Sequence, residues 1–161
     1  MKAFLIFRPL MIFGLGLCMQ AAALAQEHGT REEARQMVDA AVAYVKKVGP
    51  DQAFKDFSDK ANTAWQKKDL YIFAYSMEGV SLAHGANEKL IGKKLIDIKD
   101  PNGKPIIQEI IKALQSEPGA KDGAWVDYEW AHPQSKKVES KTSFVRRLAN
   151  VDGFVGVGVY R

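Results

Sequence analysis

DLYIFAYSMEGVSLAH, residues 69–84, is the stretch that decides the fold of this chain. Its first half alternates aromatic and aliphatic side chains, so an extended strand here has two apolar faces. These faces are Tyr71, Phe73 and Tyr75 on one side and Leu70, Ile72 and Ala74 on the other. We therefore expect a strand that is covered on both sides, then a turn at Glu78-Gly79 and a returning strand that ends in His84. An imidazole at the end of an apolar strand suggests a small-molecule pocket.

The amino terminus, residues 1–25, has the pattern of a secretory signal peptide. Lys2 and Arg8 precede an apolar run that closes with the small-residue motif Ala23-Leu24-Ala25. This pattern predicts cleavage near Ala25, a mature domain at residues 26–161 and a periplasmic or secreted protein. An uncleaved membrane anchor is the alternative, which the short length of the run disfavours.

Composition excludes several classes of function. The chain carries 23 basic and 19 acidic residues, a net charge of +4; without Lys2 and Arg8 the counts are 21 and 19, a net charge of +2. The remaining basic residues form no block, so no nucleic-acid partner is predicted. Cys18, the only cysteine, lies in the expected signal peptide, which excludes a disulfide framework and thiol chemistry in the mature domain. The length of that domain suits a single core.

Helical patterns occur before and after the quoted stretch. Thr30-Arg31-Glu32-Glu33 is a capping box, and apolar side chains then recur at three- and four-residue spacing as far as Gly49-Pro50, which ends the helix. A second, short helix is expected directly afterwards. A third is expected from Pro105, with Glu117-Pro118-Gly119 ending it.

Three further strands are expected after this helix, at residues 124–131, 138–148 and 154–160. Residues 85–101 mix Gly, Asn, Lys and Asp and predict a loop, and Asp100-Pro101-Asn102-Gly103 predicts a tight turn. The order of elements is two helices, two strands, a loop and a helix, then three strands. It predicts an α+β fold of PAS-like architecture, in which a long amino-terminal helix packs on a five-stranded antiparallel sheet.

Four segments together resemble the single Cache domain family (sCache_2-like), the extracytoplasmic sensing module of bacterial chemoreceptors and sensor kinases. They are DLYIFAYSMEGVSLAHGANEKLIGKKLIDIKDPNGKPIIQEII from Asp69, GAWVDYEWAHP from Gly123, KTSFVRRL from Lys141 and FVGVGVY from Phe154. The resemblance covers nearly the whole expected mature domain. It implies a Cache fold, a role in signal transduction or chemotaxis, and a pocket between the sheet and the segment after the hairpin. In this family the pocket commonly receives small organic molecules such as short carboxylates.

Lys141 is the first candidate for ligand binding. Its strand mixes charged, polar and apolar side chains on both faces, so a solvated edge position is one interpretation. The resemblance implies another, in which Lys141 is the cation that pairs with a ligand carboxylate. His84 also has two interpretations, a pocket residue or a structural histidine that bonds a backbone carbonyl.

Four aromatic residues complete the candidate site. Tyr128 and Trp130 share one face of their strand and combine an apolar wall with a hydroxyl and an indole N–H, and they suit a core equally well. Phe73 and Tyr75 are included because the aromatic face of the first strand is assigned to the pocket and the aliphatic face to the long helix. The resemblance also implies that a tyrosine often stands at the position of Phe144, so this chain is expected to lack one ligand-bonding hydroxyl.

No enzyme, metal site or cofactor is predicted. A hydrolytic enzyme has little support, because the sequence lacks a G-x-S-x-G elbow and a mature cysteine; H-E-x-x-H, C-x-x-C and EF-hand spacings are also lacking. Asp97, Asp100 and Asn102 are explained by a turn rather than by calcium. The main hypothesis is a small-molecule sensor that relays its occupancy to a membrane receptor or sensor kinase. A docking module with a vestigial pocket stays open, as does the choice between monomer and homodimer.

Overall fold

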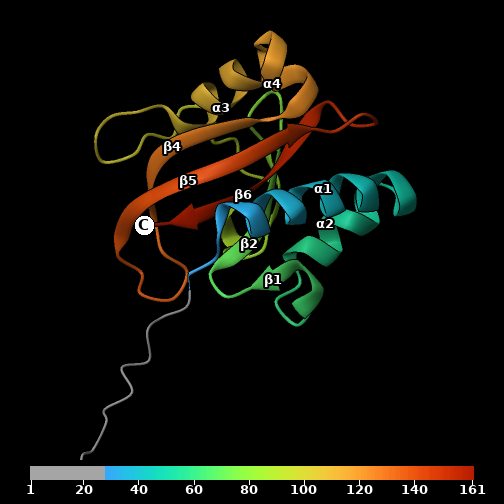
Figure 1. The fold of residues 1–161 in the computed structure, drawn as a ribbon, viewed down its shortest axis with the longest axis horizontal. Helices are drawn as coiled ribbons and strands as arrows, with labels where there is room; N and C mark the ends of the chain where they lie inside the picture. Colours follow the sequence, from blue (N-terminus) through green and yellow to red (C-terminus); the bar gives the residue numbers. More distant parts are fainter. Residues whose placement is uncertain (1–27) are drawn as a thin grey trace, which may run out of the picture.

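Two helices begin the described part of the chain, which spans residues 28–161 of the computed structural model (Figure 1). Helix α1 (Arg31–Val48) starts at the predicted capping box: the Thr30 hydroxyl accepts a hydrogen bond from the Glu33 amide at 3.1 Å, and the Glu33 carboxylate accepts one from the Thr30 amide at 2.8 Å. Helix α2 (Pro50–Ser58) follows directly. Both predicted helices are confirmed, whereas the predicted signal peptide and its cleavage site lie outside the described residues.

Six antiparallel strands form the sheet of the described chain, in the order β1-β2-β6-β5-β4, with β3 also paired to β2. The strands are β1 (Gln66–Lys67), β2 (Leu70–Ser76), β3 (Ser81–His84), β4 (Ala124–Ala131), β5 (Val138–Arg147) and β6 (Gly153–Tyr160). The PAS-like α+β fold and the predicted hairpin are confirmed, with Gly79 at the turn in the left-handed region at φ 82°. The sheet has one strand more than predicted, because the two residues of β1 are too few to leave an alternating pattern.

Within residues 28–161, four further helical segments follow the first two helices. They are η1 (Thr63–Trp65), η2 (Glu88–Leu90), α3 (Ile106–Gln115) and α4 (Glu117–Asp122). The Asp100 turn forms as predicted, with its Oδ1 accepting the amides of Asn102 and Lys104, each at 2.9 Å. The third predicted helix is confirmed as α3, which ends at Gln115, just before Glu117-Pro118-Gly119 as expected. These residues then begin a further short helix, α4, that was not predicted: Ser116 caps it, and a proline in its first turn is well tolerated.

The sheet separates two apolar layers (Figure 1). Helices α1 and α2 cover the face that carries Leu70, Ile72 and Ala74. Helix α3 and the loop before it cover the opposite face, which carries Tyr71, Phe73 and Tyr75. The prediction that this strand is buried on both faces is confirmed, since each of these six residues is at most 4 % exposed. Within residues 28–161, no helix combines the length and the hydropathy that crossing a bilayer requires.

Candidate ligand-binding site

Lys141 lies in an interior strand of the sheet. Strand β5 is paired with β4 on one side and β6 on the other, and the lysine is 1 % exposed. Its Nζ donates a hydrogen bond to the Tyr71 hydroxyl at 2.7 Å and lies 4.2 Å from the centre of that ring. The ring centres of Tyr160 and Phe73 are 4.8 Å and 5.6 Å away. The interpretation of Lys141 as a solvated edge residue was therefore wrong, because its ammonium is enclosed by three aromatic rings.

Space for the Lys141 side chain comes from Gly158 on the neighbouring strand β6. A Cβ atom at this glycine would lie 1.9 Å from Lys141 Cε and 2.5 Å from the Ser143 hydroxyl oxygen. Carbon atoms in contact are about 3.5–4.0 Å apart, so no larger residue fits without moving the lysine. Because Gly158 has no side chain, the long, charged side chain of Lys141 can lie flat against the sheet.

Burial changes the protonation of Lys141. Loss of hydration lowers the pKa of its ammonium from 10.5 to about 7, while the nearby negative charge of Asp69 acts in the opposite direction. The ion pairs formed within residues 28–161 do not include Lys141. A buried cation without a paired anion is costly. An anionic group placed beside this ammonium would therefore gain a charge-assisted hydrogen bond.

His84 is buried at the end of β3, with its ring centre 5.1 Å from that of Tyr71. Its Nδ1 accepts a hydrogen bond from the Asn87 amide at 3.0 Å, which places the proton of the neutral ring on Nε2. Burial, reinforced by the positive charge of Lys141, lowers the pKa of His84 to about 3. The ring is thus a neutral neighbour of the ammonium, and the backbone group that it bonds is an amide rather than the expected carbonyl.

A small apolar cavity is lined in part by two neighbours of Lys141, Phe73 and Tyr128. Its volume of about 20 Å³ is enough for about one water molecule. The residues that line it are Phe73, Tyr75, Ile98, Ile106, Ile107, Ile110, Tyr128 and Trp130. Tyr128 is the β4 partner of Lys141, and Phe73 contributes one of the three rings around the ammonium. The structure thus gathers the four predicted aromatic residues around one cavity. Lys141 and His84 are not among its lining residues: the Lys141 ammonium lies behind Phe73, and His84 lies beside Tyr71.

Two tyrosines that sequence reasoning did not select complete the surroundings of the ammonium. The hydroxyls of Tyr71 and Tyr160 share a hydrogen bond of 3.2 Å, and the Tyr160 hydroxyl donates to the Ala131 carbonyl at 2.9 Å. Burial raises the pKa of both phenols, so both are protonated at neutral pH. The alternating pattern of β2 indicates that Tyr71 shares a face with Phe73 and Tyr75. The Val-Gly repeat before Tyr160 gives no such indication that this tyrosine belongs to the site.

An open cleft lies outside the cavity, beside the turn between β4 and β5. Its two hollows, of about 320 and 390 Å³, share the lining residues Lys60, Tyr71, Ala86, Pro133 and Lys136. Trp130 lines both the larger hollow and the inner cavity. The charged residues that line the cleft are four exposed lysines, Lys60, Lys68, Lys89 and Lys136, and one buried carboxylate, Asp69. Its potential therefore attracts small anions toward Tyr71 and the ammonium behind it.

Phe144 lies on the opposite face of β5 from Lys141. Its ring centre is 5.1 Å from that of Trp125, and the guanidinium of Arg35 on α1 lies 5.2 Å above it. A hydroxyl here would meet α1 rather than a ligand, so the expectation that this phenylalanine removes a ligand contact was wrong. The alternation of the strand explains the error, because residues 141 and 144 point to opposite faces.

The antiparallel sheet has a long helix on one face and a small apolar cavity on the other, and the comparisons place this architecture among sensor domains. Residues 18–161 match the model of the family described as Single Cache domain 2, and the chain belongs to this family. The resemblance found in the sequence is confirmed. Domains of this family occur in chemoreceptors and sensor kinases, as the similar proteins below illustrate.

Two solved structures cover most of the chain. A methyl-accepting chemotaxis protein from Vibrio parahaemolyticus superposes with a TM-score of 0.68 and 26% identity, over 80% of this chain and 86% of that one. The second structure is described as the structural basis for carboxylic acid recognition by a Cache chemosensory domain. It has a TM-score of 0.60 and 25% identity, over 78% of this chain and 80% of that one.

Two curated sequences are similar over shorter ranges. The sensor histidine kinase MctS of Rhizobium johnstonii is 31% identical over 93 residues, which are 58% of this chain and 19% of the kinase. The methyl-accepting chemotaxis protein McpP of Pseudomonas putida is 27% identical over 92 residues, 57% of this chain and 16% of that protein. The chain thus matches less than a fifth of the length of either relative.

Proposed function

We propose that this chain is an exported sensor domain that binds a short monocarboxylate, with Lys141 as its anchoring cation, and passes its occupancy to a membrane-bound sensor. The observation that carries the proposal is a buried ammonium that contacts a hydroxyl and three aromatic rings but forms no ion pair within residues 28–161. A ligand carboxylate supplies the anion that the buried ammonium favours.

The cavity limits the size of the acid. A volume of about 20 Å³ holds about one water molecule, so even an acid of two or three carbon atoms requires the isoleucine and aromatic walls to move apart, and a longer acid requires a larger movement. The Tyr128 hydroxyl is already bonded to Ser143 at 2.8 Å. A second ligand carboxylate would be buried among apolar walls, which is costly. Dicarboxylates are therefore expected to bind less well than monocarboxylates.

Similar proteins support a sensing role. One solved relative is described by its recognition of carboxylic acids, and the two curated relatives are a sensor kinase and a chemoreceptor. These likenesses favour a relay of ligand occupancy to a receptor or kinase over a catalytic role. The basic cleft agrees with an anionic ligand, because its lysines raise the local concentration of small anions.

A thermal-shift screen tests the proposal. The chain from residue 26 to 161 is heated at pH 6.5, where Lys141 is largely protonated, with acetate, propionate, pyruvate, succinate or methylamine. An acid at 100 times its Kd should stabilise the domain by about 2.7 kcal/mol, a shift of several degrees. Lys141→Met, which keeps the length of the stem, should abolish the shift. Lys46→Met, on the exposed face of α1, should preserve it.

A shift that survives in Lys141→Met would remove the lysine from its role as anchor. The absence of a shift with every monocarboxylate would favour the alternative function, a protein-docking module with a vestigial pocket. The small size of the inner cavity is the observation that supports this alternative.

A further inference from the structure

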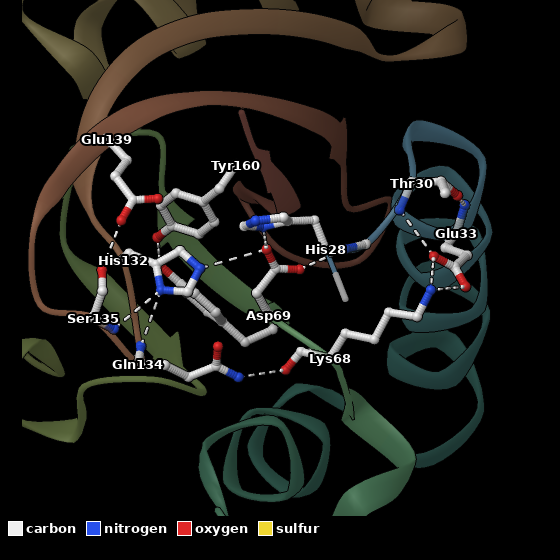
Figure 2. Close-up of polar contacts among 12 residues, drawn as sticks. His28, Thr30, Glu33, Lys68, Asp69, His132, Gln134, Ser135, Glu139 and Tyr160 are labelled. Atoms are coloured by element: carbon white, nitrogen blue, oxygen red, sulfur yellow. Dashed lines mark hydrogen bonds and ion pairs between the residues drawn. The ribbon is translucent and has the colours of Figure 1, made fainter. Parts of the chain in front are cut away.

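Two histidines and an aspartate from distant parts of the chain meet beside the start of α1 (Figure 2). His28 precedes the Thr30 cap, Asp69 immediately precedes β2, and His132 immediately follows β4. The nitrogen and oxygen atoms that they can offer to a metal ion all lie within 4.8 Å of one another. None of the three is the carboxylate anchor proposed above, although Asp69 and His132 also line the open cleft.

Asp69 is the centre of the cluster and is 1 % exposed. Its Oδ1 accepts a hydrogen bond from the Gly29 amide at 2.6 Å, which fixes the orientation of the carboxylate. Its Oδ2 lies 2.8 Å from His28 Nδ1 and 3.6 Å from His132 Nε2. Adjacent ligands of a tetrahedral zinc ion with bonds of about 2.0–2.1 Å are about 3.3 Å apart. The two distances to Oδ2 bracket that spacing.

His132 points a buried nitrogen at this carboxylate without a hydrogen bond. Its Nδ1 accepts hydrogen bonds from the amides of Gln134 and Ser135, at 3.2 Å and 3.3 Å, so the proton of the neutral ring lies on Nε2. Among the described residues that Nε2 has no hydrogen-bond partner, although the ring is only 1 % exposed. Buried polar atoms without a hydrogen-bond partner are rare. His132 Nε2 is such an atom, and it faces two other side chains that can bind a metal ion.

We propose that His28, Asp69 and His132 form a binding site for one divalent transition metal ion of the Zn²⁺ class. Two imidazoles and a carboxylate are a ligand set of open zinc sites, in which water takes the fourth position. The His28 side chain is 45 % exposed and gives the ion access from solvent, whereas the other two ligands are buried. Figure 2 shows both rings turned toward the Asp69 carboxylate.

Coordination by His132 requires the proton on Nε2 to leave. The ring stays neutral if that proton moves to Nδ1, which then no longer accepts hydrogen bonds from the amides of Gln134 and Ser135. Both residues are exposed and lie in the turn between β4 and β5, so the turn can rearrange and leave the two amides to water. Metal binding therefore changes the surroundings of these two amides in particular.

The ion connects the amino-terminal segment to the wall of the ligand pocket. His28 lies directly before α1, and the His132 ring centre is 4.5 Å from that of Tyr160. The Tyr160 hydroxyl in turn bonds the Tyr71 hydroxyl, which accepts a hydrogen bond from Lys141. A bound ion therefore restrains the start of α1 relative to the sheet, next to the proposed anchor but outside it.

Calorimetric titration of Zn²⁺ into the chelator-treated chain from residue 26 to 161 tests the proposal. We expect binding of one ion, a higher Tm, and intense visible absorption of tetrahedral Co²⁺ when Co²⁺ replaces Zn²⁺. His28→Ala and His132→Asn should each weaken Zn²⁺ binding by about tenfold or more. The asparagine can still accept the two turn amides but cannot reach the ion. Cu²⁺ and Ni²⁺ are avoided, because both also bind a free amino terminus two residues before a histidine.

Asp152→Asn, an exposed carboxylate in the turn between β5 and β6, is the matched control and should leave Zn²⁺ binding unchanged. A lack of binding at millimolar Zn²⁺ would overturn the proposal, and so would binding that both histidine variants retain. If His132→Asn does not fold, His28→Ala decides alone, because the His28 side chain is partly exposed and lies before the first helix. In ¹H–¹⁵N spectra, the amides of Gln134 and Ser135 should move on addition of Zn²⁺; unmoved amides would contradict coordination by His132.

Discussion

Replacing Lys141 by methionine should remove most of the pH dependence of stability between pH 7 and pH 9. In the folded domain, burial lowers the pKa of the lysine from 10.5 to about 7. The unfolded chain therefore holds more protons than the folded chain in this window, and the free energy of unfolding rises with pH. The cost of burying the charge is fully present below pH 7 and is gone above the ordinary pKa of 10.5.

The change in the free energy of unfolding with pH can be calculated from the shift in the pKa of Lys141. One unit of pKa corresponds to about 1.4 kcal/mol, so the free energy of unfolding of the ligand-free wild type should rise by about 2 kcal/mol from pH 7 to pH 9. Two other buried groups change charge outside this window, since the pKa of His84 is lowered to about 3 and that of Tyr75 is raised to about 12. Lys141→Met has no charge to bury, so its stability should be nearly constant across the window and higher than that of the wild type at pH 7.

Urea unfolding, followed by tryptophan fluorescence at pH 7, 8 and 9, measures these free energies. Lys46→Met is the control and should keep the wild-type slope, because its side chain is exposed. Parallel pH profiles for wild type and Lys141→Met would refute the reasoning, because the lysine would then be hydrated or paired with an anion in the folded domain.

Three further substitutions test the geometry of the pocket. Gly158→Ala puts a Cβ atom 1.9 Å from Lys141 Cε, so it should cost about 1–3 kcal/mol in urea unfolding and abolish the thermal shift with short acids; a normal shift would show that the lysine can move aside. Ile107→Val removes one methyl group from the cavity wall, and calorimetry should show a gain of about fourfold in relative affinity for an acid one carbon longer. Phe144→Tyr should leave ligand affinity unchanged, since the ring faces α1; a change of tenfold would contradict the assigned faces of β5.

Much of the fold could be predicted because local patterns and tertiary structure agree. The alternation in residues 70–75 assigned one side of β2 to the long helix and the other to the pocket, and the capping box at Thr30 marked the start of α1. Elements of two to six residues, such as β1 and α4, were not predicted from the sequence, because their positions depend on neighbours in space rather than on periodicity.

The candidate site was less accessible to sequence reasoning. Polar residues precede and follow Lys141 in its strand, so the sequence pattern does not indicate burial. The lysine is buried because β5 pairs between β4 and β6 and because Gly158 has no side chain beside it. Tyr160 belongs to the site only because β6 returns beside β5. The cluster of His28, Asp69 and His132 has no spacing motif, since the fold alone brings these residues together.

Calorimetric titration at several pH values tests the central claim, that the ammonium of Lys141 anchors a ligand carboxylate, most directly. The acid with the largest thermal shift is titrated into the wild-type chain at pH 6, 7, 8 and 9, where carboxylic acids stay ionised. Only the protonated lysine provides the anchoring charge, and its pKa in the free domain is about 7. The account predicts that affinity changes little from pH 6 to pH 7 and then falls by about tenfold for each further pH unit. An affinity that is constant from pH 6 to pH 9 would contradict it.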